Sequence, residues 1–230
     1  MSLIRAALSS ARHYDYLITI SGMDYPVWSN QRIMDYFGKM KADGREIIYG
    51  IKMNKADKAF NIYSNYRFLG CRHWSNGSIK SKMRTLLRRC SAILPIKKPF
   101  CFYGDSKMYH LYKGAAWWAI STELAKLVLS SYDNDRKLVK YFQTSFCPAE
   151  TFVQTIAFNS EFADKCLLKK GAYTNLNDLT PFTYIDYNPV VKVLTGEDYS
   201  RVKDSGKMFC RKTRTDVSDE FMNMIDSSRE

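Results

Sequence analysis

Long apolar runs are missing from this sequence of 230 residues. A membrane-spanning helix needs roughly 18 or more consecutive apolar residues, and no stretch approaches that length. The segment after Met1 also lacks a long apolar stretch ending in small residues, which is the pattern of a secretory signal. We therefore expect a soluble chain that is cytoplasmic or peripheral to a membrane.

The six cysteines are not spaced as metal ligands. There is no CxxC pair and no histidine at zinc-ligand spacing, so a structural zinc site is not expected. An even number of cysteines permits three disulfides, but no secretory signal is visible, and we expect free, mostly buried thiols instead.

Acidic residues are in short supply, with 23 Asp and Glu against 35 Lys and Arg, for a net charge of +12. Such a surplus indicates an anionic partner, which charge alone leaves open between nucleic acid, a lipid surface and a phosphorylated small molecule. The basic residues are spread over several segments without a long uninterrupted block. We therefore do not expect nucleic acid as the partner.

Hydrophobic residues make up 46% of the chain, enough to form the core of one folded domain over residues 1–230. Apolar and β-branched runs alternate with segments of helical periodicity. The expected strands are 16–20, 46–51, 100–103, 115–120, 182–186 and 207–211. The expected helices include 80–93, 136–142 and 149–158, and others capped by Ser29 or Asn30, by Ser121 and by Thr195. A helix is also expected at the start of the chain, through Leu3 and Leu8, and another from Ser218. This alternation predicts an α/β fold, a mixed sheet flanked by helices.

Separated segments, in the right order, carry a resemblance to a known family. They are Gly22 to Asn30, Gly114 to Ser121, Cys147 to Thr155, and a weaker match from Leu194 to Lys212. Together they resemble the core-2/I-branching N-acetylglucosaminyltransferase family, which includes peptide xylosyltransferases. The resemblance implies a GT-A-like fold and inverting transfer of a sugar from a nucleotide-sugar donor to a glycan acceptor. For a eukaryotic source it also implies a place in the Golgi lumen.

The chain departs from the family pattern in places that bear on the site. Ala149 replaces an acid beside the implied base, and Thr122 follows Ser121 where arginine is usual. The resemblance also begins part-way into the family's catalytic domain. We therefore expect the first strand-helix unit, where relatives hold the nucleoside, to be lacking, so that the chain is truncated at its amino end or its donor site is incomplete.

The resemblance implies roles for individual residues. Glu150 would be the general base, although an acid at a helix start is ordinarily a stabilising end charge. Arg211 and Lys212 would bind the donor diphosphate, whereas the pattern alone favours a basic surface. Asp24 would bond donor or acceptor hydroxyls, or cap its own loop.

Trp117 and Trp118 stand next to each other in an expected strand. Neighbouring strand residues point to opposite faces, so one should pack in the core and the other would be free to stack on a sugar. Packing of both in the core is nevertheless the favoured interpretation.

A divalent cation held by a D-x-D pair serves many transferases of this fold. The pair present here is Asp133-Asn134-Asp135, between two expected helices, where capping or solvation is its expected use. The resemblance implies a reaction without metal or cofactor beyond the donor, which we expect to be UDP-N-acetylglucosamine, with xylose as second choice. A catalytically impaired carbohydrate-binding remnant is the alternative.

Overall fold

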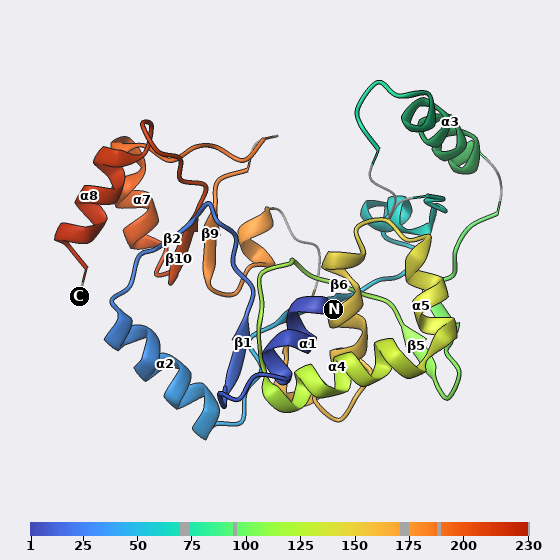
Figure 1. Ribbon diagram of the computed structural model, residues 1–230, viewed down its shortest axis with the longest axis horizontal. Helices are drawn as coiled ribbons and strands as arrows, with labels where there is room; N and C mark the ends of the chain where they lie inside the picture. Colours follow the sequence, from blue (N-terminus) through green and yellow to red (C-terminus); the bar gives the residue numbers. More distant parts are fainter. Residues whose placement is uncertain (70–73, 94–95, 171–174, 188–189, 230) are drawn as a thin grey trace.

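The computed structural model describes residues 1–230 except 70–73, 94–95, 171–174, 188–189 and 230 (Figure 1). The helices are α1 (Ser2–Leu8), α2 (Asn30–Ala42), α3 (Ile79–Ile93), α4 (Thr122–Asn134), α5 (Arg136–Gln143), α6 (Phe152–Phe158), α7 (Tyr199–Asp204) and α8 (Asp219–Ser227). Short 3-10 helices are η1 (Lys58–Ser64), η2 (Pro148–Glu150), η3 (Ala163–Lys165), η4 (Leu176–Asp178) and η5 (Gly196–Asp198). The strands are β1 (Tyr16–Ile18), β2 (Asp24–Pro26), β3 (Tyr49–Lys52), β4 (Cys101–Tyr103), β5 (Met108–His110), β6 (Tyr112–Lys113), β7 (Ala119–Ser121), β8 (Leu167–Leu168), β9 (Thr183–Ile185) and β10 (Phe209–Arg211). Strands and helices alternate, so the predicted α/β class is confirmed.

The strands form several short sheets. β1 pairs with β7, β4 pairs with β5, and the other sheets have the orders β2-β10-β9 and β6-β3-β8. Both three-stranded sheets are mixed, because β10 is antiparallel to β2 and parallel to β9, and β3 is antiparallel to β6 and parallel to β8. A bridge between Ile47 and Ala119 connects the segment before β3 with β7. The mixed pairing and flanking helices agree with a GT-A-like fold.

The strand predicted over 115–120 is shorter than expected, since β7 begins at Ala119. Side chains donate hydrogen bonds to the backbone carbonyl groups that precede β7. Gln154 Nε2 donates to the Ala115 carbonyl at 2.7 Å, and Thr19 Oγ1 donates to the Ala116 carbonyl at 2.6 Å. Carbonyl groups satisfied in this way do not join a strand ladder.

The helix predicted over 149–158 is divided. Cys147 adopts a left-handed backbone conformation with φ 43°, and η2 follows it before α6 begins at Phe152. Helix α2 begins after the predicted cap Ser29 and passes through Gly38 without a break. The helix continues to Ala42 because the chain turns only at Gly44, whose φ is +61°.

The buried apolar residues form three clusters, two of which lie on different sides of the molecule. The larger part lies around α4 and α6, where Ile120, Leu124 and Ile156 are completely buried. A second cluster includes Val27 of the segment after β2, Cys210 of β10 and Phe221 of α8. Figure 1 shows α7, α8, β2, β9 and β10 together on the left and α4 and α5 at the lower right.

Helix α3 stands apart from both sides at the upper right of Figure 1. Its bounds confirm the prediction of a helix over 80–93. Among the described residues, no helix is both long and apolar enough to cross a membrane.

The cysteines are less buried than predicted. Those that the structure describes are free, but only Cys166 and Cys210 are buried, and Cys90 is exposed. Cys71 lies outside the described residues.

Candidate active site

Glu150 closes the 3-10 turn η2, and its backbone N–H donates to the Cys147 carbonyl at 2.9 Å. Its side chain meets β6 and η1. Glu150 Oε2 accepts hydrogen bonds from Lys113 Nζ at 2.9 Å and from the Tyr63 hydroxyl at 3.1 Å. The Lys113 side chain is 4% exposed, whereas that of Glu150 is 31% exposed. A buried cation thus holds a carboxylate that solvent still reaches.

The two donors reach the same oxygen of Glu150. Within the described part of the chain, no donor is recorded on Oε1. A carboxylate fixed through one oxygen keeps the other free to accept a proton, which is the geometry that a general base needs. The dipole of a long helix does not contribute here, because Glu150 lies in a 3-10 turn and not in the first turn of an α-helix.

An apolar pocket of about 600 Å³ lies next to this turn. Its wall includes Pro148 and Ala149 of η2, Phe152 of α6, and Trp118. Ala149, the residue that departs from the family pattern, therefore contributes to this wall, while Glu150 bonds to Lys113 on β6.

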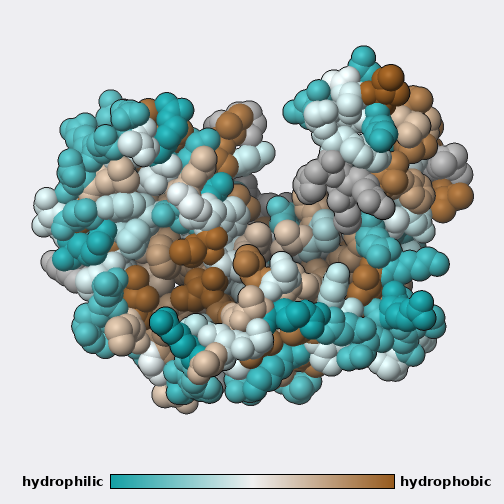
Figure 2. Space-filling view, in the orientation of Figure 1, coloured by the Kyte–Doolittle hydropathy of each residue, from teal (hydrophilic) through white to brown (hydrophobic). Residues whose placement is uncertain are grey.

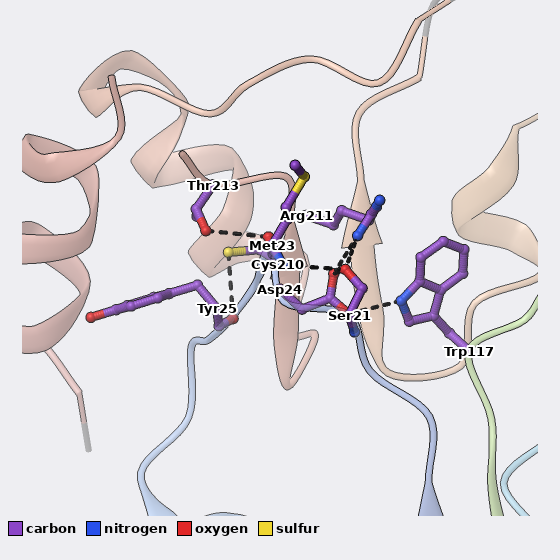
Figure 3. Close-up of polar contacts among 8 residues, drawn as sticks. All are labelled: Ser21, Met23, Asp24, Tyr25, Trp117, Cys210, Arg211 and Thr213. Atoms are coloured by element: carbon purple, nitrogen blue, oxygen red, sulfur yellow. Dashed lines mark hydrogen bonds and ion pairs between the residues drawn. The ribbon is translucent and has the colours of Figure 1, made fainter. Parts of the chain in front are cut away.

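A second polar cluster surrounds Asp24, whose side chain is 0% exposed (Figure 3). The Asp24 carboxylate accepts hydrogen bonds from the Ser21 backbone at 2.7 Å, Trp117 Nε1 at 2.9 Å and Arg211 Nη1 at 3.1 Å. The antiparallel register of β10 and β2 places Arg211 directly opposite Asp24. Asp24 therefore caps its own loop, as one of the two predicted uses, and also ties that loop to β10 and to Trp117.

Arg211 is oriented by more than its ion pair. Its Nη1 also donates to the Ser21 hydroxyl, and its guanidinium lies 5.2 Å from the centre of the Trp117 ring. The side chain is 20% exposed. Arg211 thus reaches the surface with its direction fixed by Asp24, Ser21 and Trp117.

Lys212 follows at the end of β10 and is half-buried. Its backbone carbonyl accepts from the Leu194 N–H at 3.0 Å, which holds the chain after the strand. For the described ranges of the chain, no ion pair or hydrogen bond is recorded for the Lys212 ammonium. In the predicted phosphate-binding pair, Arg211 is therefore held by Asp24, whereas the Lys212 ammonium has no partner among the described residues.

Trp117 and Trp118 lie just before β7, so their placement within a strand was wrong. Trp118 is buried in the main core, and Trp117 is half-buried, packs against the same core and donates its indole N–H to Asp24. Both indoles therefore contact the core, which is the packing favoured from the sequence.

One short segment joins the Glu150 cluster to the Asp24 cluster. Lys113 stands at the first cluster and Trp117 at the second, and their Cα atoms, four residues apart, are separated by at most about 14 Å. Gly114, between them, has no room for a side chain, because a Cβ would lie 2.3 Å from the Tyr49 carbonyl oxygen. The separation of the two clusters is therefore fixed by a tightly packed connection.

The thiols at the two clusters are held in their neutral form. Burial and, secondarily, the charge of Glu150 raise the pKa of Cys147. Burial, with the charge of Asp24, raises the pKa of Cys210 to about 12. Neutral thiols are poor nucleophiles, so neither is a candidate for covalent catalysis.

The carboxylates of the D-x-D pair have structural partners. Asp133 forms an ion pair with Arg5 at 2.7 Å, and Asp135 caps α5 by accepting from the Leu138 N–H at 2.8 Å. Capping or solvation was the use predicted for this pair, and Asp135 is the member that caps a helix. Across the described ranges, no three His, Cys, Asp or Glu side chains gather into a group able to hold a metal ion.

Lys113 and Tyr63 were missed in the sequence. Lys113 directly precedes the segment Gly114 to Ser121, so its place beside a site motif was an available signal. Tyr63 lies in η1, within the region 54–76 where the sequence has no clear period, and nothing there distinguishes it from the other aromatic residues.

The mixed α/β arrangement with these two clusters has the features of a GT-A-like glycosyltransferase fold. The family described as "Branch: Core-2/I-Branching enzyme" matches residues 1–225. The chain therefore belongs to the Core-2/I-Branching enzyme family, which confirms the resemblance found in the sequence.

Curated relatives match a smaller part of the chain. It is 39% identical over 62 residues to the xylosyltransferase sqv-6 of Caenorhabditis elegans and 36% identical over 62 residues to that of Caenorhabditis briggsae. Each alignment covers 27% of this chain and 8% of the relative. The matched region is thus a small part of the length of these proteins.

Proposed function

We propose that this protein is an inverting glycosyltransferase that moves a sugar from a UDP conjugate to a glycan hydroxyl, with Glu150 as the general base. Membership of the Core-2/I-Branching enzyme family supports sugar transfer. The observation that carries the role of Glu150 is its carboxylate, which Lys113 and Tyr63 hold through Oε2 while Oε1 accepts no hydrogen bond from the described residues.

In the proposed reaction Glu150 accepts the proton of the acceptor hydroxyl while that oxygen attacks the anomeric carbon. The bond between the anomeric carbon and the diphosphate breaks in the same displacement, and its electron pair leaves with UDP. Attack opposite the leaving group inverts the anomeric centre. One carboxylate is sufficient, which suits a site where Ala149 replaces the neighbouring acid.

We propose that Arg211 and Lys212 stabilise the leaving diphosphate without a metal ion. Arg211 is oriented by Asp24, and Lys212 brings an ammonium for which no protein partner is recorded in the described residues. The short connection from Lys113 to Trp117 supports this assignment, because it keeps the segments that carry the two clusters close together along the chain.

N-acetylglucosamine is the donor sugar that we propose first. Xylose is the second candidate, and the observation in its favour is the name of the relatives, which are called xylosyltransferases. A carbohydrate-binding protein without transfer activity remains the alternative from another functional class.

The test is calorimetric titration of the purified chain with UDP, followed by transfer assays with UDP-N-acetylglucosamine and UDP-xylose. We expect UDP binding and transfer from one of the two donors. Binding of glycan without UDP would support the binding protein, and transfer that retains the anomeric configuration would contradict an inverting mechanism.

A further inference from the structure

Helix α3 exposes its apolar residues to solvent. Ile79 is 84% exposed, Leu86 62% and Ile93 85%, and Met83 and Leu87 are also exposed. A helix on the surface of a folded domain ordinarily turns such residues toward the core. Figure 2 shows hydrophobic surface on this projecting part of the molecule, at the upper right.

The exposed residues form one stripe. Positions 79, 83, 86 and 93 recur at helical spacing, so their side chains share one face along the helix of 15 residues. The polar face turns inward instead. Ser91 is buried and donates from its hydroxyl to the Tyr66 carbonyl at 2.8 Å, and Arg84 lies 5.8 Å from the centre of the Trp74 ring.

Basic residues border the stripe. Lys80 lies on one side of it by helical position, and Lys82 and Arg89 lie on the other, all exposed. No Asp or Glu occurs between Asp57 and Asp105, so the segment around α3 carries positive charge without neighbouring acids. The exposed surface of α3 thus combines an apolar stripe with cations along both edges.

We infer that α3 is the surface by which this protein docks on an anionic lipid bilayer, lying flat with its apolar stripe among the acyl chains. Such a composition is typical of helices that bind in the membrane interface. The basic edges complement anionic headgroups. At about 1.5 Å per residue, α3 is about 22 Å long, which is shorter than the hydrocarbon core of roughly 30 Å, so it does not span the bilayer.

An anionic bilayer accounts for both the apolar stripe and the basic edges of α3. Nucleic acid or a polyanionic glycan would pair with Lys82 and Arg89 but would leave Leu86 and Ile93 in water. This inference rests on α3 alone and does not depend on the proposed transfer reaction.

The experiment is flotation of the full chain with vesicles of phosphatidylcholine, alone or containing phosphatidylserine. We expect binding to the anionic vesicles and little to the neutral ones. The double variant Leu86→Ser with Ile93→Ser should bind at least tenfold more weakly. The double variant Lys82→Gln with Arg89→Gln should bind the anionic vesicles roughly thirtyfold more weakly. Each basic residue near the surface contributes about 1 kcal/mol, and about 1.4 kcal/mol corresponds to a tenfold change in affinity.

The control is Met34→Ser on α2, which replaces a side chain of similar exposure in another helix and should bind as the wild type does. Because the replaced side chains on α3 are largely exposed, circular dichroism of all variants should match. Equal binding to neutral and anionic vesicles, or no binding to either, would overturn the inference. So would loss of vesicle binding in the charge variant alone, which would indicate electrostatic adsorption to headgroups without insertion of the apolar stripe, or tight binding of the wild type to an acidic protein but not to vesicles.

Discussion

Lys113 explains how a partly exposed carboxylate keeps one orientation. Its ammonium is 2.9 Å from Glu150 Oε2, and its side chain is almost completely buried. The ring of Tyr63 lies 5.3 Å from the same ammonium and packs edge-on against Phe146 at 5.3 Å between ring centres. Lys113 and Tyr63 are therefore positioning residues, which act on the reaction through Glu150.

Replacing Lys113 by Met should lower kcat by roughly tenfold or more, because the Glu150 carboxylate loses the cation that aims it. The dissociation constant for UDP should stay within about twofold, since the nucleotide does not contact Lys113 in the proposed arrangement. Steady-state kinetics and calorimetry measure the two quantities.

The matched control is Lys137→Met, which removes an exposed lysine from its ion pair with Asp105 and should change neither quantity. A Lys113→Met protein with normal kcat would remove Lys113 from the positioning of the base, provided that both variants melt like the wild type.

Lys212→Ala should weaken UDP binding by about ten- to a hundredfold, because a charge-assisted contact to the diphosphate is lost. The difference from the wild type should narrow at high salt, which screens the contact that the variant already lacks. Calorimetry at low and high ionic strength measures this, with Lys39→Ala on α2 as the control.

Chelation tests whether the diphosphate is bound without a metal ion. EDTA should leave UDP binding unchanged if Arg211 and Lys212 take the place of a cation. Loss of binding with EDTA and its recovery with Mn²⁺ would contradict this assignment and return Asp133 and Asp135 as candidate ligands.

At the scale of elements, the connection between β6 and β7 holds the two halves of the site at a fixed separation. Gly114→Ala should destabilise the fold by about 2 kcal/mol or more, because its Cβ meets the Tyr49 carbonyl and the Gln154 side chain. Gly38→Ala within α2 is the opposite case. Nothing lies within 4 Å of its Cβ, so it should stabilise the helix by about 0.5–1 kcal/mol. Denaturant unfolding of both variants measures the difference, and similar stability for the two would contradict the close packing at Gly114.

Lys98 connects η1 to the end of α5. Its backbone N–H donates to Ser64, and its buried Nζ donates to the carbonyl of Tyr141 and to the hydroxyls of Thr144 at 3.1 Å and Ser145 at 2.6 Å. Burial lowers the pKa of Lys98 to about 7. Between this value and the ordinary pKa near 10.4, the unfolded chain binds more protons than the folded one, so stability rises with pH.

The contribution of Lys98 should therefore increase the free energy of unfolding by about 1.5 kcal/mol between pH 7 and pH 8.5. The Lys98→Met variant should lack this increase. Urea unfolding of both proteins at the two pH values isolates the contribution, because the remaining ionisable groups are common to both. A wild type and variant with parallel pH profiles would show that Lys98 stays charged in the folded protein.

At the scale of the whole molecule, local patterns in the sequence were sufficient for the fold class and most helix starts. Ser29 and Ser121 cap α2 and α4 as predicted, since a cap depends on residues a few positions apart. The division of the helix at Glu150 was not predictable in this way. It depends on the backbone conformation of Cys147, which no local periodicity reports.

In the candidate site, too, local sequence patterns predicted single residues but not the contacts between distant ones. Motif resemblance located Glu150, Asp24 and Arg211 one by one, but it could not show that Asp24 holds Arg211. That contact joins residues of β2 and β10 through strand pairing. Likewise, η1 brings Tyr63 to Glu150 across a long stretch of chain, and the sequence has no signal for such a contact.

The most direct test of the account is Glu150→Gln, assayed for both transfer and UDP binding. The amide keeps an oxygen to accept from Lys113 and Tyr63 but does not take up the acceptor proton, so turnover should fall by about 10²- to 10⁴-fold. UDP affinity should stay within about twofold of the wild type, and the exposed control Glu161→Gln should be unchanged in both assays. Near-normal turnover by Glu150→Gln, under conditions where the wild type transfers sugar, would contradict Glu150 as the base.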